Sequence, residues 1–126
     1  LDNEIVEIYS TQKIIPSAGQ GIIALQCRND DKEIISILEK VNHTKTCYQA
    51  NAERNVLKIL EGDCETAVGV HAVIEKEELT LTAELFSIDG TQRFYEKKKS
   101  NIKNSKETGK ELGEILKEKS KNSYKK

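Results

Sequence analysis

The feature that most constrains this fold is a two-residue alternation of apolar side chains in two neighbouring segments. Every second position is apolar in residues 68–74 and again in residues 79–86, which is the period of a strand with one buried face. The pair Asp89-Gly90 is typical of a hairpin turn, so residues 92–98 are expected to return beside the second segment with Phe94 inside. The sequence therefore predicts a three-stranded antiparallel sheet.

Two helical segments flank these strands. Residues 46–60 carry apolar side chains at helical spacing, and Gly62 is suited to the left-handed conformation that ends many helices. Residues 105–119 have a second apolar stripe, in which Gly109 and Gly113 are expected to weaken the helix. Both helices are expected to cover one face of the sheet, which gives an α+β fold.

A strand and a helix are predicted upstream of this unit. Residues 22–28 alternate between apolar and polar positions, with Cys27 on the apolar side as a core residue. Asp30 and Glu33 have the spacing of a capping box, and a helix is expected to run from there to about Val41. Because this strand–helix segment has no sheet of its own to pack on, it is expected to belong to another domain.

Composition excludes several classes of protein. The 126 residues contain no apolar run near the roughly 18 residues that a membrane helix requires. Three cysteines form no CxxC pair, and the two histidines lack metal-ligand spacing. These features predict a cytoplasmic protein with free thiols and no metal site. Because the first residue is Leu1 and not Met, the chain is expected to be part of a longer polypeptide.

Positive charge is concentrated at the end of the chain. From Lys97 onward, eleven lysines stand against four glutamates. Such a tail can bind nucleic acid or another anion. It is also typical of a solvated helix with a frayed end, and Tyr124 is the sole aromatic residue among the lysines. The second interpretation is favoured, with residues from Lys121 onward expected to be disordered.

Cys64 is the cysteine best placed to carry chemistry. It follows the predicted helix of residues 46–60 and has Glu61, Asp63 and Glu65 as neighbours. The negative end of the helix dipole and these carboxylates disfavour a thiolate. This setting suits a permanent covalent attachment better than repeated nucleophilic turnover or thiol redox exchange. From the pattern alone, however, an ordinary loop cysteine is the favoured interpretation.

Three arginines stand among seventeen lysines, and two of them occupy positions suited to a ligand. Arg28 ends the predicted strand, and Arg54 lies on the helix that precedes Cys64. Arginine binds carboxylates through two parallel hydrogen bonds, so both are candidates for an acidic ligand. An ion pair within the protein explains Arg54 equally well. Gln20 lies between two glycines, where the backbone can approach a ligand closely.

Several runs of residues, in a fixed order, resemble the signatures of porphobilinogen deaminase, also called hydroxymethylbilane synthase. They are Pro16-Ser17-Ala18-Gly19-Gln20-Gly21 continuing to Gln26-Cys27-Arg28, then Asn42-His43, Ala52-Glu53-Arg54, Leu60-Glu61-Gly62-Asp63-Cys64 and Asp89-Gly90. The resemblance extends over nearly the whole chain, to about Glu118. Two departures stand at the loop of the cysteine: Asp63 replaces a second glycine, and the proline common after the cysteine is absent.

The resemblance implies an activity and a cofactor. The family condenses four porphobilinogen molecules into hydroxymethylbilane with release of ammonia, on the route to haem and other tetrapyrroles. It uses a dipyrromethane cofactor held by a thioether to one cysteine, and Cys64 matches that cysteine. Gln20 and Arg28 match residues near the pyrrole site, and Arg54 matches an arginine near the cofactor loop. The implied ligands are porphobilinogen and the growing polypyrrole chain.

The resemblance also implies a domain layout. Residues 1–21 would end the second domain, residues 22–43 would complete the first, and residues 44–126 would form the third, cofactor-bearing domain. The family's catalytic aspartate lies in an N-terminal part that has no counterpart here, so we assign no catalytic residue. The chain alone is expected to be inactive, and apolar surface on residues 22–41 predicts self-association. The alternative is a small α+β binding module whose basic C-terminal helix contacts RNA or another anion.

Overall fold

The sheet has the topology that the alternation predicts. The computed structural model describes residues 4–61 and 66–125. In it β1 (Val68–Glu75), β2 (Glu78–Phe86) and β3 (Arg93–Asn101) are antiparallel neighbours in the order β1-β2-β3. The register places Val70 opposite Ala83 and Ala83 opposite Glu96. The alternating apolar side chains of β2 are all fully buried: Leu79, Leu81, Ala83 and Leu85.

The predicted hairpin turn lies between β2 and β3. Gly90 has a φ of +70°, a conformation that favours glycine, and its N–H donates to the Ser87 carbonyl at 2.9 Å. The Asp89 carboxylate accepts from the Ser87 hydroxyl at 2.5 Å and from the Thr91 N–H at 3.1 Å. These hydrogen bonds, with that from Ser87 the strongest, hold the pKa of Asp89 below its ordinary value.

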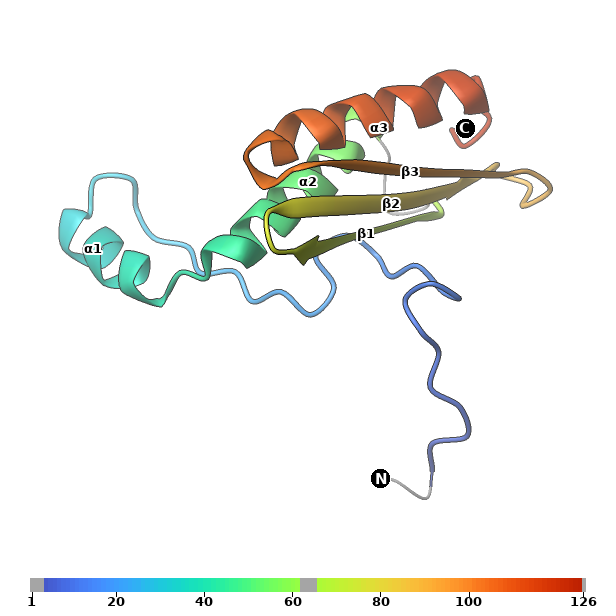
Figure 1. The fold of residues 1–126 in the computed structure, drawn as a ribbon. Coiled ribbons are helices and arrows are strands. Elements are labelled where there is room, and N and C mark those ends of the chain that lie inside the picture. Colours follow the sequence, from blue (N-terminus) through green and yellow to red (C-terminus); the bar gives the residue numbers. More distant parts are fainter. Residues whose placement is uncertain (1–3, 62–65, 126) are drawn as a thin grey trace.

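Two helices cover one face of the sheet and leave the other face open (Figure 1). α2 (Thr44–Leu60) and α3 (Ser105–Ser120) lie side by side over the strands, and the short 3-10 helix η1 (Ile102–Asn104) joins β3 to α3. The core between the layers consists of Ala52, Val56, Leu60, Val70, Ala72, Leu79, Leu81, Ala83, Leu85, Leu112, Leu116 and Tyr124. The predicted α+β arrangement is confirmed.

Two glycines of α3 allow the close approach of α2. A Cβ at Gly109 would lie 2.2 Å from the carbonyl oxygen of Ala52, and one at Gly113 would lie 2.8 Å from the Cβ of Ile59. Heavy atoms do not approach so closely in a packed interior. The glycines that the sequence suggested would weaken the helix are therefore the residues that permit the α2–α3 packing.

α1 (Lys32–Val41) stands apart from the sheet, near the N-terminal end of α2 (Figure 1). Its N-cap is Asp31, whose carboxylate accepts from the Ile34 N–H at 3.2 Å. The predicted cap at Asp30 is therefore wrong by one residue, because a turn that closes from Arg28 to Asp31 places Asp30 before the helix. None of the residues of α1 is buried.

The predicted strand at residues 22–28 is not formed, and these residues have no regular secondary structure. A strand needs a neighbour with which its backbone groups can pair. In the described part of the chain, the strands pair only within the sheet of β1, β2 and β3. Ile23 and Leu25 are 89% and 63% exposed, and Cys27, predicted to be a core residue, is only partly buried.

None of the helices within residues 4–61 and 66–125 combines the length and the apolar character needed to cross a membrane.

Candidate functional site

Glu53 is a buried carboxylate that fastens two other segments to α2. Its side chain lies on the covered side of the helix, and the residue is 4% exposed. The Gly19 N–H donates to one carboxylate oxygen at 2.7 Å, and the Ala72 N–H donates to the other at 2.8 Å. Hydrogen bonds to an ionised acceptor are the stronger kind. One residue therefore holds both the turn next to Gln20 and the edge of β1.

The segment before this turn lies along the free edge of β1. The Val70 N–H donates to the Pro16 carbonyl at 2.8 Å. Ile15 is buried against Gly69, where a Cβ would lie 2.7 Å from the Ile15 carbonyl oxygen. The amide of Gln49, one turn before Glu53 on α2, donates to the Ala72 carbonyl at 2.6 Å. The region from residue 15 to residue 19 is thus attached to the sheet and to α2.

The structure brings the turn of Gln20 to the helix of Arg54. The Gln20 side-chain oxygen accepts from the Ser17 hydroxyl at 3.0 Å. The backbone N–H of Gln20 donates to the Ser17 carbonyl at 3.1 Å and closes the turn. Arg54 follows Glu53 directly and is exposed. Within residues 4–61 and 66–125 no ion pair involves Arg54, and its role at a ligand stays a prediction.

Arg28 lies elsewhere in the structure. Its guanidinium pairs with the Asp31 carboxylate at 3.1 Å, just before α1, and the side chain is 83% exposed. α1 lies near the N-terminal end of α2, whereas Cys64 follows the C-terminal end (Figure 1). The 17 residues of α2 span about 25 Å. The structure does not bring Arg28 to the end of α2 that precedes Cys64, and its role stays a prediction.

α2 ends at Leu60 and is followed by a left-handed C-cap residue, Glu61. The left-handed conformation predicted for Gly62 is not tested by the described residues. Glu61 has a φ of 52°, and its N–H donates to the Leu57 carbonyl at 3.0 Å. Gly62 and Cys64 lie outside the described residues. The proposed attachment residue thus follows closely on a helix end whose geometry is defined.

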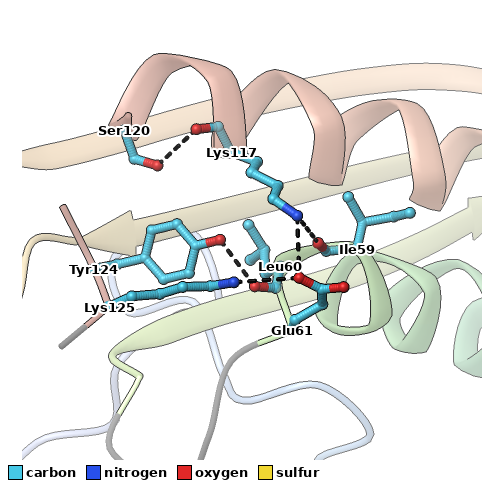
Figure 2. Close-up of polar contacts among 7 residues, drawn as sticks. All are labelled: Ile59, Leu60, Glu61, Lys117, Ser120, Tyr124 and Lys125. Carbon is cyan, nitrogen blue, oxygen red and sulfur yellow. Dashed lines mark hydrogen bonds and ion pairs between the residues drawn. The ribbon is translucent and has the colours of Figure 1, made fainter. Parts of the chain in front are cut away.

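Lysines from the end of the chain surround the Glu61 carboxylate (Figure 2). The Lys117 ammonium lies 3.2 Å from it and also donates to the Ile59 carbonyl at 3.4 Å, and the Lys125 ammonium lies 3.3 Å away. The hydrogen bond from Lys117 is the main cause that holds the pKa of Glu61 below its ordinary value, and Lys125 acts in the same direction. Glu61 is exposed, so each pair is screened by solvent.

Residues 121–125, predicted to be disordered, form a turn that folds back onto α2 (Figure 2). Tyr124 is 3% exposed, and its hydroxyl donates to the Leu60 carbonyl at 2.8 Å. The Ile88 N–H, in the β2–β3 turn, donates to the Ser123 carbonyl at 2.9 Å. The tail is ordered because Tyr124 buries a large ring and pairs its hydroxyl, which the surrounding lysines and asparagines cannot do.

Metal chemistry has no support in the part of the chain that the structure describes. No group of three or more His, Cys, Asp or Glu side chains there is arranged to hold an ion. Cys27 and Cys47 are both free thiols. The features that remain at the C-terminal half of α2 are a fixed helix end, an exposed guanidinium and two ammonium groups.

Sequence reasoning missed two residues of this arrangement. Glu53 is a charged residue on the buried stripe of an amphipathic helix, and that position was the signal that it satisfies buried backbone donors. Tyr124 was the lone aromatic residue in a Lys-rich tail, a weaker signal that the tail returns to the core.

Comparisons with known proteins agree with the resemblance in the sequence. The family model described as "Porphobilinogen deaminase, C-terminal domain" matches residues 47–118. A porphobilinogen deaminase of Desulforamulus reducens is 36% identical over 115 residues, which are 91% of this chain and 37% of that protein. One from Staphylococcus carnosus is 36% identical over 118 residues, 93% of this chain and 38% of that protein. One from Coxiella burnetii is 40% identical over 90 residues, 71% and 29% of the two chains. The chain thus spans less than two-fifths of the length of these relatives.

Proposed function

The chain belongs to the porphobilinogen deaminase family, whose C-terminal domain it matches, and on this premise we propose that it forms the cofactor-bearing part of a hydroxymethylbilane synthase. The complete enzyme would condense four porphobilinogen molecules into hydroxymethylbilane and release ammonia at each condensation. The observation that carries the proposal is the match over residues 47–118, which includes most of α2, the segment with Cys64, the whole sheet and most of α3.

Cys64 is the residue proposed to hold the dipyrromethane, through a thioether. When bound, this group supplies the pyrrole end to which porphobilinogen units are added. The residues on both sides of the segment fit a permanent attachment. Glu61 is fixed by the α2 end and two lysines, and the Ala67 carbonyl accepts from the Phe86 N–H at 3.0 Å. The residues before and after the segment with Cys64 are thus held in place. Once the thioether has formed, the sulfur need not ionise again.

Arg54 and Gln20 are proposed to face the pyrrole units. Porphobilinogen carries acetate and propionate groups, so a chain built from it needs cations nearby. The exposed Arg54 guanidinium offers two parallel donors for such a carboxylate. Glu53 supports this role, because the hydrogen bond that it accepts from the Gly19 N–H places the turn of Gln20 beside the helix of Arg54.

Arg28 is proposed to act from a different domain. Residues 22–43 expose apolar side chains along α1 and before it, including Ile23, Leu25 and Val41. Such a surface is typical of a segment that packs against a partner. We infer that residues 22–43 complete the first domain of the enzyme, on a sheet supplied by residues outside this chain, and that residues 1–21 lead into it.

The alternative anion-binding module is disfavoured by the ion pairs of the basic region. Lysines of β3, α3 and the tail are paired with glutamates within the domain: Lys98–Glu111, Lys99–Glu78, Lys110–Glu107, Lys117–Glu61, Lys119–Glu96 and Lys125–Glu61. Charges neutralised in this way contribute less to the binding of nucleic acid.

A chimeric enzyme tests the proposal. In the Desulforamulus reducens relative, the 115 aligned residues are replaced by those of this chain, and the purified product is analysed by intact mass and peptide mapping. We expect an adduct of two linked pyrroles on Cys64 and turnover of porphobilinogen. The matched Cys64→Ser chimera should carry neither. A folded, unmodified chimera, or an adduct on Cys27 or Cys47, would contradict the proposal.

The chain by itself is predicted to be inactive, because no catalytic aspartate of the family has a counterpart in it. Turnover of porphobilinogen by the purified 126-residue chain would refute this. A cytoplasmic location stays a prediction.

A further inference from the structure

We propose that Lys117, Tyr124 and Lys125 form a clasp that positions the end of α2, and through it the segment that carries Cys64. The three residues hold Leu60 and Glu61, the last described residues before that segment. They would be positioning residues for the attachment, and this role rests on the proposed function of Cys64. The family match ends at residue 118, so Tyr124 and Lys125 lie outside it.

The clasp contacts three groups of the helix end: the Ile59 carbonyl, the Leu60 carbonyl and the Glu61 carboxylate (Figure 2). Tyr124 donates its hydroxyl to the Leu60 carbonyl at 2.8 Å, and Lys117 donates to the Ile59 carbonyl at 3.4 Å. These carbonyls belong to the last turn, where a helix has no internal donors for them. Lys117 and Lys125 together pair with the Glu61 carboxylate. The clasp thus fixes both the backbone and the side chain at the point where the chain leaves the helix.

The clasp is itself anchored to the rest of the domain. Lys121 and Asn122 both adopt the left-handed conformation, with φ values of 48° and 61°, and so reverse the chain after α3. The Ser120 hydroxyl donates to the Lys117 carbonyl at 3.0 Å, and the Ile88 N–H donates to the Ser123 carbonyl at 2.9 Å. The tail therefore links the β2–β3 turn, α3 and α2.

A positioning role and a general contribution to stability differ in which amides exchange faster when the clasp is removed. If the clasp only stabilises the fold, its removal accelerates amide exchange in the core strands and at the end of α2 alike. If it positions the helix end, the last turn of α2 opens locally while β2 stays protected. The reactivity of the Cys64 thiol, compared with that of Cys47 at the N-terminal end of α2, gives a second measure. A positioning role predicts that the ratio changes, and a general loss of stability predicts that it does not.

The test is Tyr124→Phe in the 126-residue chain. The matched control is Tyr95→Phe, at an exposed tyrosine on β3. Amide exchange is followed by mass spectrometry, and alkylation by iodoacetamide is mapped to each cysteine. We expect exchange in residues 57–61 to rise at least tenfold and in β2 less than twofold. The ratio of the Cys64 to the Cys47 alkylation rate should rise at least threefold. Tyr95→Phe should change none of these values.

Three results would overturn the clasp: equal acceleration in β2 and at the end of α2, no acceleration at the end of α2, or an unchanged alkylation ratio. Should Tyr124→Phe fail to fold, the double variant Lys117→Gln and Lys125→Gln decides. It removes the two partly exposed ion pairs with Glu61 and the Lys117 hydrogen bond to the Ile59 carbonyl. It should show the same pattern, with exchange at the end of α2 raised about twofold. In a chimera extended so that it carries this chain through Tyr124 and Lys125, an adduct formed equally fast with Tyr124→Phe would refute the clasp alone. No adduct on Cys64 in any variant would refute the proposed function alone.

Discussion

The carboxylate of Glu53 and the backbone N–H of Gly19 are joined at 2.7 Å across 34 positions of the chain. The same carboxylate accepts from the Ala72 N–H on β1. This relationship attaches the turn next to Gln20 to α2 and to the sheet. It also explains why a charged residue occupies the covered side of a helix, since both of its oxygens replace water as acceptors for buried donors.

Replacing Glu53 with glutamine should destabilise the domain. The amide keeps one acceptor, but its NH2 group would face a backbone N–H, which leaves a donor unpaired. We expect a loss of about 1.5–3 kcal/mol in the free energy of unfolding, measured by urea denaturation, and faster amide exchange at Gly19 and Ala72. Glu114→Gln, on the exposed side of α3, is the matched control and should change neither. Equal stability of the Glu53→Gln variant would show that the hydrogen bonds from Gly19 and Ala72 to Glu53 do not stabilise the domain.

Alanine at the glycines of α3 should destabilise the protein although alanine is the better helix former. The gain in helix propensity is about 1 kcal/mol, but a Cβ at residue 109 would lie 2.2 Å from the Ala52 carbonyl oxygen. Separating the two helices costs more, about 1–3 kcal/mol for overpacking. We expect a lower unfolding midpoint for Gly109→Ala and a smaller decrease for Gly113→Ala. Glu114→Ala, exposed on the same helix, should be neutral, and a more stable Gly109→Ala would contradict the packing argument.

Lowering the pH should remove the contribution of the Glu61 ion pairs to the free energy of unfolding. Its pKa lies below the ordinary value of 4.5 because Lys117 and Lys125 bind the ionised form. The stabilisation is therefore fully present above pH 4.5, and it is lost as the pH falls through the lowered pKa. The difference in unfolding free energy between the native chain and Glu61→Gln should be present at pH 7 and should shrink as the pH falls below 4.5. A difference that grows on acidification would reverse the assigned sign.

The isolated chain should self-associate through α1 and the residues before it. Ile23 and Leu25 expose 89% and 63% of their surface, and Val41 exposes 65%. Sedimentation velocity should show a weight-average mass above 14.2 kDa that rises with concentration. The double change Ile23→Ser and Leu25→Ser should lower it, whereas Val73→Thr, on the open face of the sheet, should not. A monomer at every concentration would rule out this surface.

Local patterns were sufficient to predict the sheet and the two helices that cover it. The alternation in β1 and β2, the Asp89-Gly90 turn and the apolar stripe of α3 each depend on neighbours within a few residues. The strand predicted at residues 22–28 fails for the opposite reason, because its formation depends on a partner strand that its own residues cannot specify. The shift of the α1 cap from Asp30 to Asp31 reflects two adjacent aspartates, either of which can cap a helix.

The contacts around the candidate site could not be predicted because they join distant positions. Glu53 meets Gly19 and Ala72, and Tyr124 meets Leu60, 64 residues away. No periodicity encodes such pairs. The sequence was misleading at Gly109. Its low helix propensity can be read from the sequence, but its contact with Ala52 on α2 cannot. The role of Cys64 rests on the family and on chemistry, and its test is the mapped adduct.

The attachment of residues 15–19 also determines how the sheet meets other molecules. An edge strand with free backbone groups is a template for pairing with a second chain, and so a starting point for aggregation. On β1 the outward N–H groups of Val70 and Ala72 are occupied by the Pro16 carbonyl and the Glu53 carboxylate. The opposite edge, β3, carries three consecutive lysines, which discourage strand pairing by charge. The domain thus protects one border by covering it and the other by repulsion, and release of residues 15–19 would expose the first.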